Sequence, residues 1–355
     1  MTELEIAQYR LQSQRIAKTE HKTAKEIVGW MGAMQAQDFA MSKWAIGARL
    51  PNATDKQVEK AFNDGDILRT HVMRPTWHLV SADDIYWMLE LTATRIKAIT
   101  KVRDIALGID ESIYAKTNAI LEKSLSGGKQ LTSDELKVIF ENEKIDTNEN
   151  RFYHYMMQAE IDAVVCSGAV KNKKQTYALL SERVPKVQRF SKDESLTKLA
   201  ERYFKSHGPA TLKDFVWWSG LTVSDARKGL ESVKDKFISE IIDSETYWFE
   251  SSIHNFTSDN SAVYLLPAFD EFIISYKNRN AIISPEHQTL AFSSNGIFRP
   301  LIVVDGQVIG IWKRTNKKNS TVIEPTFFKS KNISKTLIKK AINSYCIYLE
   351  KPVEM

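Results

Sequence analysis

Segments with apolar residues at helical spacing recur along this chain, and several of them open on one polar signature. In this signature a Ser or Thr is followed three residues later by Asp or Glu: Thr23–Glu26, Ser81–Asp84, Thr132–Glu135, Thr211–Asp214 and Thr222–Asp225. At a helix N-terminus the hydroxyl accepts a hydrogen bond from the N–H of the third helical residue, and the carboxylate lies at the positive end of the helix dipole. The five matches predict five helix N-termini.

Residues 211–251 combine two of these signatures with a strand pattern. The expected elements are a helix from Thr211, a turn at Ser219–Gly220, a helix from Thr222 to about Val233, and two strands within 237–251 around Asp243–Ser244. Helix, tight turn, helix and β-hairpin is the plan of a winged helix-turn-helix. A generic α+β protein with several capped helices is the alternative interpretation.

Two weaker copies of this plan precede it. Residues 132–185 predict a helix from Thr132, a second from about Arg151 to Ser167, and a stretch with Lys171, Lys173 and Lys174 before a further apolar run. The first 80 residues predict helices at 4–18, 24–34 and 55–63, then a hairpin over 67–80 with its turn at Arg74–Thr76.

Beyond residue 260 the pattern favours strands. The expected strand regions are 262–276, 289–294, 296–312 and 321–328, which are rich in Val, Ile and Phe. Asp305–Gly306 between two apolar runs predicts a tight hairpin turn. A closing helix is expected at about 333–349, with Lys335, Lys339 and Lys340 on its polar side. This part is expected to form a mostly antiparallel sheet or barrel.

These elements predict an α+β protein with four parts. They are a winged-helix-like unit at 1–100, a second at 101–190, a third at 191–258, and a β-rich module with its closing helix at 259–355. A length of 355 residues is sufficient for two or three domains of ordinary size.

Composition excludes several classes of protein. No apolar run approaches the ~18 residues that a membrane span requires, and the N-terminus lacks a signal-peptide pattern, so a cytoplasmic, nucleoid-associated protein is expected. Cys166 and Cys346 form no CxxC pair, which argues against a disulfide scaffold or a zinc site. The Gly-rich motifs of nucleotide-binding loops are absent, and no cofactor is expected.

The net charge is +5, from 49 Lys and Arg against 44 Asp and Glu, and residues 301–355 hold ten basic and four acidic side chains. Tandem winged helices with basic hairpins predict duplex DNA as the partner, bound in a salt-dependent manner. The candidate contacts are Arg69, Arg74, His78, Lys277, Arg279, Arg299, Lys313 and Arg314. For any single one the alternative is a solvated surface charge. His71 and His78 have no third ligand in the pattern, so we expect DNA contacts or packed strand histidines and no metal.

The segment Gln35-Ala36-Gln37 lies after the second expected helix. Residues two apart on a helix point to different faces, so the two glutamines can converge only if the helix has ended and the chain is extended. From the residues alone, two solvent-exposed glutamines at a helix end are the alternative. Asp38 next to them is either a nearby base or a helix cap.

Several blocks, in the same order over nearly the whole chain, resemble the winged-helix family of DNA glycosylases typified by AlkZ, which unhook interstrand crosslinks. The blocks are Gln35–Asp38, Arg69 with Arg74–His78, His207–Thr211, Leu265–Asp270, Tyr276–Arg279, Gly296–Arg299, Val304–Gly306 and Gly310–Trp312.

The resemblance implies a C-shaped arrangement of tandem winged helices with a basic concave face, a monomer, and a catalytic Gln-apolar-Gln motif that Gln35 and Gln37 fill. A sister group, typified by YcaQ, has Asp where Gln37 stands. The family also requires a β-hairpin in its cleft. The turns at Ser293–Gly296 and at Asp305–Gly306 both qualify.

The residue types limit the chemistry. Glutamine is no general base near pH 7, but its amide can hold a water and steady a sugar cation by hydrogen bonds. A purine alkylated at N7 is already cationic and can leave without a general acid. We therefore predict a monofunctional glycosylase for N7-alkylated purines, including bulky or crosslinked ones, with Gln35 and Gln37 as catalytic residues. A non-catalytic DNA-binding regulator or architectural factor is the alternative, and a protein-interaction scaffold is the third.

Overall fold

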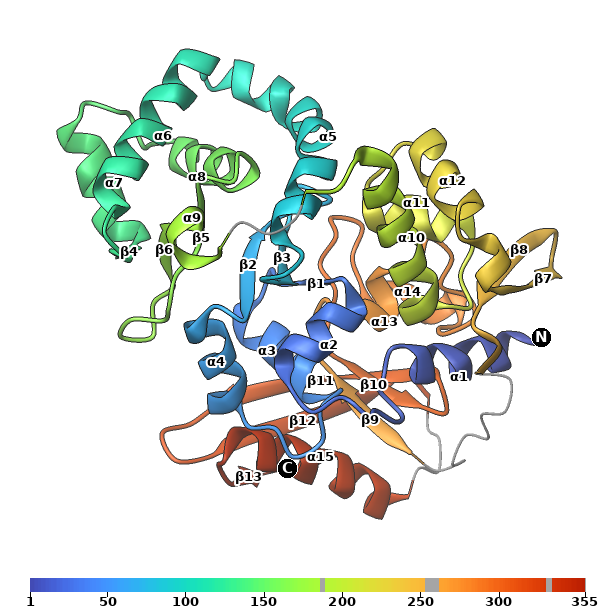
Figure 1. Ribbon diagram of the computed structural model, residues 1–355. Helices are drawn as coiled ribbons and strands as arrows, with labels where there is room; N and C mark the ends of the chain where they lie inside the picture. Colours follow the sequence, from blue (N-terminus) through green and yellow to red (C-terminus); the bar gives the residue numbers. More distant parts are fainter. Residues whose placement is uncertain (186–188, 253–261, 330–333, 355) are drawn as a thin grey trace. The chain divides into compact units, whose positions relative to one another are not determined.

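The computed structural model describes residues 1–185, 189–252, 262–329 and 334–354 (Figure 1). The chain divides into two compact units. Unit 1 contains Met1–Val58, Leu196–Trp218 and Thr222–Met355, and unit 2 contains Glu59–Ser195 and Ser219–Leu221. The four-part division expected from the sequence stays a prediction.

Unit 1 is built from stretches that are far apart in the sequence. Its elements are α1 (Glu3–Ser13), α2 (Ala24–Met31), β1 (Ala33–Gln35), α3 (Phe39–Gly47), α11 (Leu212–Ser219), α12 (Val223–Glu231), η1 (Lys234–Lys236), β7 (Ile238–Ile242), β8 (Glu245–Phe249), β9 (Val263–Leu266), α13 (Glu271–Ile274), η3 (Pro285–His287), α14 (Gln288–Ala291), β10 (Leu301–Val304), β11 (Gln307–Asn316), β12 (Thr321–Phe327), α15 (Lys335–Leu349) and β13 (Val353–Glu354). The boundaries between the units fall within α4 (Asp55–Asp64) and α10 (Lys192–His207).

Unit 2 combines helices with three small antiparallel strand pairings. Its elements are β2 (Ile67–His71), β3 (Trp77–Ser81), α5 (Ile85–Ala106), α6 (Glu111–Leu125), β4 (Leu131–Thr132), α7 (Ser133–Asn142), α8 (Arg151–Ile161), β5 (Val165–Ser167), β6 (Thr176–Leu179) and α9 (Leu180–Arg183). Strand β2 pairs antiparallel with β3, as the 67–80 pattern predicts. Leu121, Leu136 and Phe140, each fully buried, belong to the core that joins α6, α7 and α8.

Four of the five predicted N-terminal caps are present. Thr23 and Thr132 form full capping boxes, and Thr211 and Thr222 accept hydrogen bonds from the N–H of Asp214 and Asp225. The fifth prediction is wrong, because Ser81 is the last residue of β3 and α5 begins only at Ile85. Its pairing with Ile67 places Ser81 in the β2–β3 ladder, so its hydroxyl is not at a helix end.

The element order predicted for 211–251 is confirmed. Helices α11 and α12 are followed by β7 and β8, which pair antiparallel around Asp243–Ser244. Both turn residues have positive φ, 48° and 66°, as a two-residue hairpin turn with right-handed strand twist requires. In 132–185 the predicted helix over 151–167 is too long: α8 ends at Ile161, and the β-branched and small residues 165–167 form β5.

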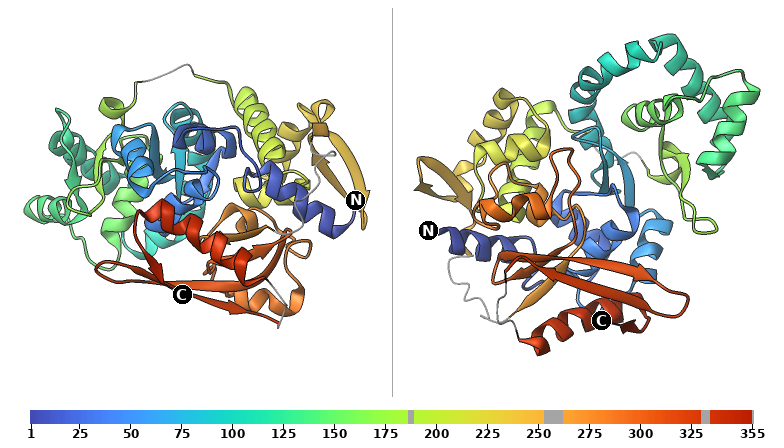
Figure 2. Two further views of the ribbon diagram at one scale, coloured as in Figure 1. Left: turned by 90° about the horizontal axis from the view of Figure 1, so that it is seen from below. Right: turned by 180° about the vertical axis from the view of Figure 1, so that it is seen from behind.

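The C-terminal sheet is open, with the strand order β13-β12-β11-β10-β9. The barrel alternative is therefore wrong. Consecutive residues of β10, Leu301, Ile302 and Val303, are all fully buried, so both faces of the sheet are covered and it has no need to close on itself. On one face Leu301 and Val303 pack with Ala7 and Leu11 of α1, and on the other Trp312 packs against Tyr345 of α15. The two helices lie on opposite faces of the sheet (Figure 2).

Two predicted strand regions contain short helices instead. Within 262–276 only β9 is extended, because Asp270 caps α13 by accepting the N–H of Phe272 at 2.8 Å. Within 289–294 the chain forms the end of α14. Apolar runs of four to six residues do not distinguish a buried strand from a buried helix. The hairpin at Asp305–Gly306 and the closing helix α15 are confirmed.

We expect Thr132→Ala to lower the free energy of unfolding by about 1 kcal/mol, because the variant loses the hydroxyl that accepts the N–H of Glu135. Urea unfolding followed by circular dichroism measures the change. Thr132→Ser keeps the cap and is the control. Equal stability of Thr132→Ala and wild type would contradict the assignment of the capping box.

Candidate active site

The Gln35-Ala36-Gln37 segment follows a sharp end to α2. The predicted helix over 24–34 is three residues too long, because Gly32 has a φ of +79° and ends the helix after Met31. A Cβ on Gly32 would lie 3.0 Å from Cδ of Arg202 and 3.5 Å from the Trp218 ring. A residue with a side chain is therefore disfavoured here by both its backbone angle and its space. The chain then enters β1.

Burial alternates along the motif. Met34 and Ala36 are buried, whereas Gln35 is half-buried and Gln37 is exposed. Strand β1 ends at Gln35, and the chain bends at Gln37 and Asp38. The first condition for convergence of the two glutamines, a helix that ends before the motif, is met, and the extended conformation continues as far as Gln35.

Asp38 caps the next helix. Its carboxylate accepts the N–H of Met41 at 3.0 Å at the start of α3. The helix-cap interpretation of Asp38 is therefore confirmed.

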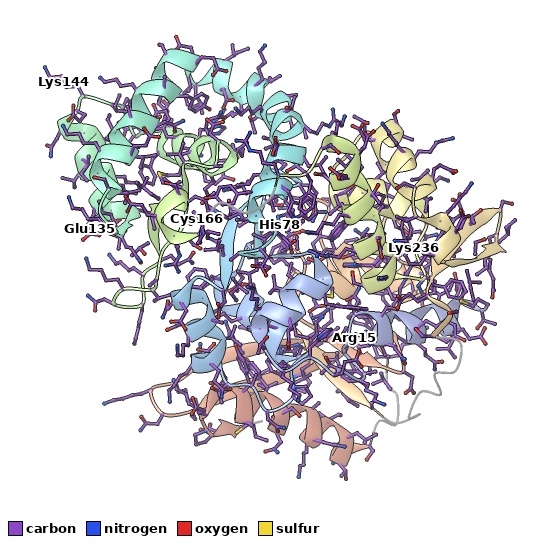
Figure 3. The ribbon with its side chains drawn as sticks, in the orientation of Figure 1. Arg15, His78, Glu135, Lys144, Cys166 and Lys236 are labelled. Carbon is purple, nitrogen blue, oxygen red and sulfur yellow. The ribbon has the colours of Figure 1, made fainter. Side chains whose placement is uncertain are left out.

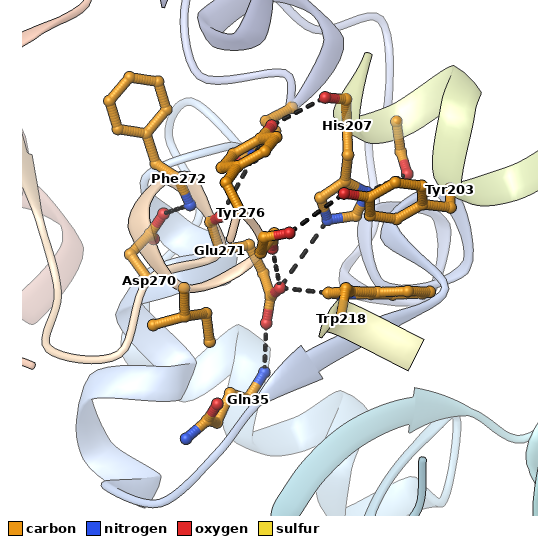
Figure 4. Close-up of polar contacts among 12 residues, drawn as sticks. Gln35, Tyr203, His207, Trp218, Asp270, Glu271, Phe272 and Tyr276 are labelled. Carbon is orange, nitrogen blue, oxygen red and sulfur yellow. Dashed lines mark hydrogen bonds and ion pairs between the residues drawn. The ribbon is translucent and has the colours of Figure 1, made fainter. Parts of the chain in front are cut away.

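Glu271 accepts a hydrogen bond from the backbone of the motif (Figure 4). One carboxylate oxygen, Oε1, accepts the N–H of Gln35 at 2.6 Å. The other, Oε2, accepts the indole N–H of Trp218 at 3.1 Å and the hydroxyl of Ser275, and His207 Nε2 lies 3.8 Å from it. Glu271 is 1% exposed. It thus connects the ends of α10 and α11 and the short helix α13 to β1.

Burial and hydrogen bonding act in opposite directions on this carboxyl group. Burial favours its neutral form, but the polar contacts from His207, Ser275 and the Gln35 N–H hold the pKa of Glu271 at about 2. Burial lowers the pKa of His207 below its ordinary value, against the opposing influence of Glu271. Glu271 is therefore ionised at neutral pH.

The neighbouring acid, Asp270, has a different environment. Both of its oxygens accept hydrogen bonds from the guanidinium of Arg49, each at 2.8 Å, and both residues are fully buried. Arg49 also donates to the backbone and side-chain carbonyl oxygens of Gln14. This ion pair attaches α3 and α1 to the start of α13 and so fixes the position of Glu271.

Three of the predicted DNA contacts lie on the β2–β3 hairpin of unit 2, where Arg69 is 9% exposed and His78 is fully buried. The Arg69 guanidinium lies over the Trp77 ring, 4.1 Å from its centroid. His78 Nδ1 is 2.9 Å from the carbonyl oxygen of Thr76, and its Nε2 is 3.3 Å from the half-buried Arg74. His78 is labelled in Figure 3.

His71, on β2, is also packed. Its Nδ1 contacts the carboxylate of Glu160, and its Nε2 lies 2.9 Å from the hydroxyl of Tyr153. The packed-histidine interpretation is therefore confirmed for His71. Among the described residues no three His, Cys, Asp or Glu side chains are grouped so as to hold a metal ion.

The other predicted contacts belong to unit 1. Lys277, Arg299 and Lys313 are exposed. Lys277 and Arg279 both lie over the Trp217 ring, at 4.6 and 5.4 Å from its centroid. Arg314 is half-buried and donates to the hydroxyl of Tyr345 at 2.7 Å. Arg279 is half-buried too, and its Nε donates to the carbonyl of Ile273 at 2.8 Å.

The two candidate turns differ in exposure. A Cβ on Gly306 would lie 2.8 Å from the backbone of Ala7, so the Asp305–Gly306 turn packs against α1. The turn at 293–297 is exposed throughout, and a Cβ on Gly296 would meet nothing within 4 Å. The Arg279 guanidinium lies 5.0 and 5.4 Å from the rings of Phe292 and Phe298 at its base.

Sequence reasoning missed Glu271 and Arg49. A signal for the acid exists: Asp270 and Glu271 interrupt an otherwise apolar run, and acidic residues in such a run are buried only with partners. Gln35 and Arg49, the partners of these two acids in the N-terminal part of the chain, lie more than 200 positions away from them.

No helix in the described part of the chain is both long and apolar enough to cross a membrane.

Comparison with known proteins defines the class to which this fold and site belong. The model of the family described as "DNA glycosylase AlkZ-like" matches residues 28–335. The interstrand DNA cross-link repair glycosylase of Streptomyces sahachiroi is 22% identical over 339 residues, which cover 87% of each chain. The solved structure of S. sahachiroi DNA glycosylase AlkZ superposes with a TM-score of 0.83 at 18% identity, and the match covers all of this chain and 99% of the other.

The family model, which matches most of the chain, identifies a DNA glycosylase. The chain belongs to the DNA glycosylase AlkZ-like family, and its α+β fold is that of the solved relative.

Proposed function

We propose that this enzyme excises N7-alkylated purines from double-stranded DNA, including bulky and interstrand-crosslinked ones, by hydrolysis of the N-glycosidic bond. Its relative from S. sahachiroi is described as an interstrand DNA cross-link repair glycosylase, which supports the crosslinked substrate class. The observation that carries the proposal is the Gln35–Gln37 segment, which lies outside any helix between α2 and α3 and in which the backbone N–H of Gln35 donates to the buried Glu271.

The chemistry needs little proton transfer. As the C1′–N9 bond breaks, its electron pair moves to the cationic purine, which leaves neutral, and the positive charge passes to the sugar. A water then adds to C1′ and releases its proton to solvent. The Gln35 and Gln37 amides would orient this water and stabilise the sugar cation through their carbonyl oxygens. Asp38 remains the cap of α3 in this scheme.

The exposed cations of unit 1, Lys277, Arg299 and Lys313, would contact phosphates. Burial leaves Arg69 and His78 little surface, so we propose that these two support the β2–β3 hairpin. Arg279 and Arg314 would stabilise, through these hydrogen bonds, the strands and turns that carry the exposed cations.

Release of bases from defined oligonucleotides tests the proposal. A duplex with one N7-methylguanine and a duplex with one N7-linked interstrand crosslink are incubated with the protein, and abasic sites are revealed by strand cleavage in hot alkali. We expect cleavage at the lesion and none in undamaged duplex. Salt-dependent duplex binding without base release would identify the non-catalytic alternative, and absence of both would identify an interaction scaffold.

We further propose that the exposed 292–298 turn, rather than the Asp305–Gly306 turn, inserts into the DNA. Ile297, 53% exposed, would then pack against the duplex.

We expect Ile297→Ser to weaken binding of lesion-containing duplex by roughly tenfold, as the loss of one partly buried aliphatic contact implies. Fluorescence anisotropy measures the affinity. The control is Ile347→Ser, which removes a similarly exposed residue, at 50%, from α15. Equal affinities for the two variants would exclude the 292–298 turn.

A further inference from the structure

Two adjacent buried acids differ in how their charge is compensated. Asp270 is paired with Arg49 through two hydrogen bonds. Among the described residues the one ion-pair partner of Glu271 is His207, whose Nε2 lies 3.8 Å from the carboxylate, beyond hydrogen-bond distance. The close partners of Glu271 are the uncharged donors of Gln35, Trp218 and Ser275. A buried carboxylate without a cation in close contact is costly to maintain.

The proposed reaction provides the missing positive charge. Both side chains of the Gln35–Gln37 motif are neutral amides, yet positive charge moves from the purine to the sugar in the transition state. Opposite charges attract more strongly in a poorly solvated site than in water. The carboxylate of Glu271 accepts a hydrogen bond from the backbone N–H of Gln35 in β1 (Figure 4).

We infer that Glu271 is a positioning residue for base excision: its carboxylate fixes Gln35 through the backbone N–H and places a negative charge behind a catalytic motif that has none. This inference rests on the proposed function and adds to it a third residue. If Glu271 only held β1, α11 and α13 together, its replacement would change the stability of the protein alone. The proposed role also requires an effect on the chemical step.

The test compares Glu271→Gln with wild type under single-turnover conditions on the N7-methylguanine duplex. Gln keeps the size of the side chain and a carbonyl acceptor for the Gln35 N–H but removes the charge. We expect the excision rate to fall roughly tenfold to hundredfold, with the affinity for the same duplex unchanged, because the lost interaction acts in the transition state. The control is Glu194→Gln, which removes one exposed carboxylate but leaves an acceptor for the N–H of Ser191.

The outcomes separate the two proposals. An inactive wild-type protein overturns the proposed function and this inference with it. An active wild type with Glu271→Gln equally fast overturns the role of Glu271 alone. A slower Glu271→Gln with proportionally weaker DNA binding also overturns that role, because it identifies a general loss of structure.

Ser275→Ala provides a second route if Glu271→Gln fails to fold. It keeps the carboxylate but removes one donor, so it raises the pKa of Glu271. Protonation of Glu271 then begins at higher pH, and we expect the ratio of the variant's excision rate to the wild-type rate to fall as the pH is lowered. The titratable groups near Glu271 are His207, Tyr203 and Tyr276. Protonation of His207 affects both proteins, and the comparison of the two profiles removes its contribution. Superimposable pH profiles would overturn the inference.

Discussion

Gln35→Ala and Gln37→Ala are each expected to slow base release by roughly 100-fold to 1,000-fold, the loss that accompanies removal of one preorganised group that stabilises charge in a transition state. The affinity for lesion-containing duplex is expected to stay the same, because the two amides act on the water and the sugar cation rather than on the phosphates. Single-turnover release of N7-methylguanine measures the rate, and fluorescence anisotropy measures the affinity.

Asp38→Asn is the matched control for these variants. Asn caps helices as well as Asp does, so α3 should keep its N-terminal hydrogen bond to Met41. The variant removes the carboxylate nearest to the motif in the sequence. Base release at the wild-type rate is expected. A loss as large as that of Gln37→Ala would instead make Asp38 the base that activates the water.

Arg49→Leu is expected to destabilise the protein by about 3–5 kcal/mol, because it leaves the fully buried Asp270 without its cation. Asp270 also caps α13, which begins at Glu271. A shift of α13 would displace Glu271 from Gln35, so the excision rate is expected to fall together with stability. Thermal unfolding and urea titration measure the first effect, and the single-turnover rate at low temperature measures the second.

Lys60→Ala is the control for Arg49→Leu. It breaks the exposed pair between Lys60 and Asp64, which is screened by water and is expected to leave the unfolding midpoint unchanged. The double variant Arg49→Leu/Asp270→Leu removes both charges and is expected to recover part of the lost stability. If Arg49→Leu unfolds no earlier than Lys60→Ala, the buried pair contributes nothing to stability.

Local features were predictable because their energetics lie within a few residues. Four N-terminal caps, the β7–β8 hairpin and the Asp305–Gly306 turn follow from hydrogen bonds and backbone preferences that short segments satisfy by themselves. A prediction failed where a local preference competed with strand pairing. Ser81 has the signature of a cap, but its pairing with Ile67 in the β2–β3 ladder decided the outcome.

Helix α3, which follows the motif directly, was not predicted. Its residues Phe39–Gly47 are nearly all apolar or small, so its pattern has no clear polar face. Trp44 in this helix packs against Tyr345 and Tyr348 of α15, roughly 300 positions later in the chain. The helix is buried by partners that a local pattern does not reveal.

The sequence by itself determined the order of the motifs, the α+β class and the two glutamines. Tertiary structure alone decided that Glu271 accepts the N–H of Gln35, which lies 236 positions before it in the chain, and that Arg49 pairs with Asp270. It also decided that the turn at 293–297 is exposed and that the Asp305–Gly306 turn is packed. The physical reason is that a buried charge is stable only with partners supplied by distant segments, and these are brought together only when the whole of unit 1 is folded.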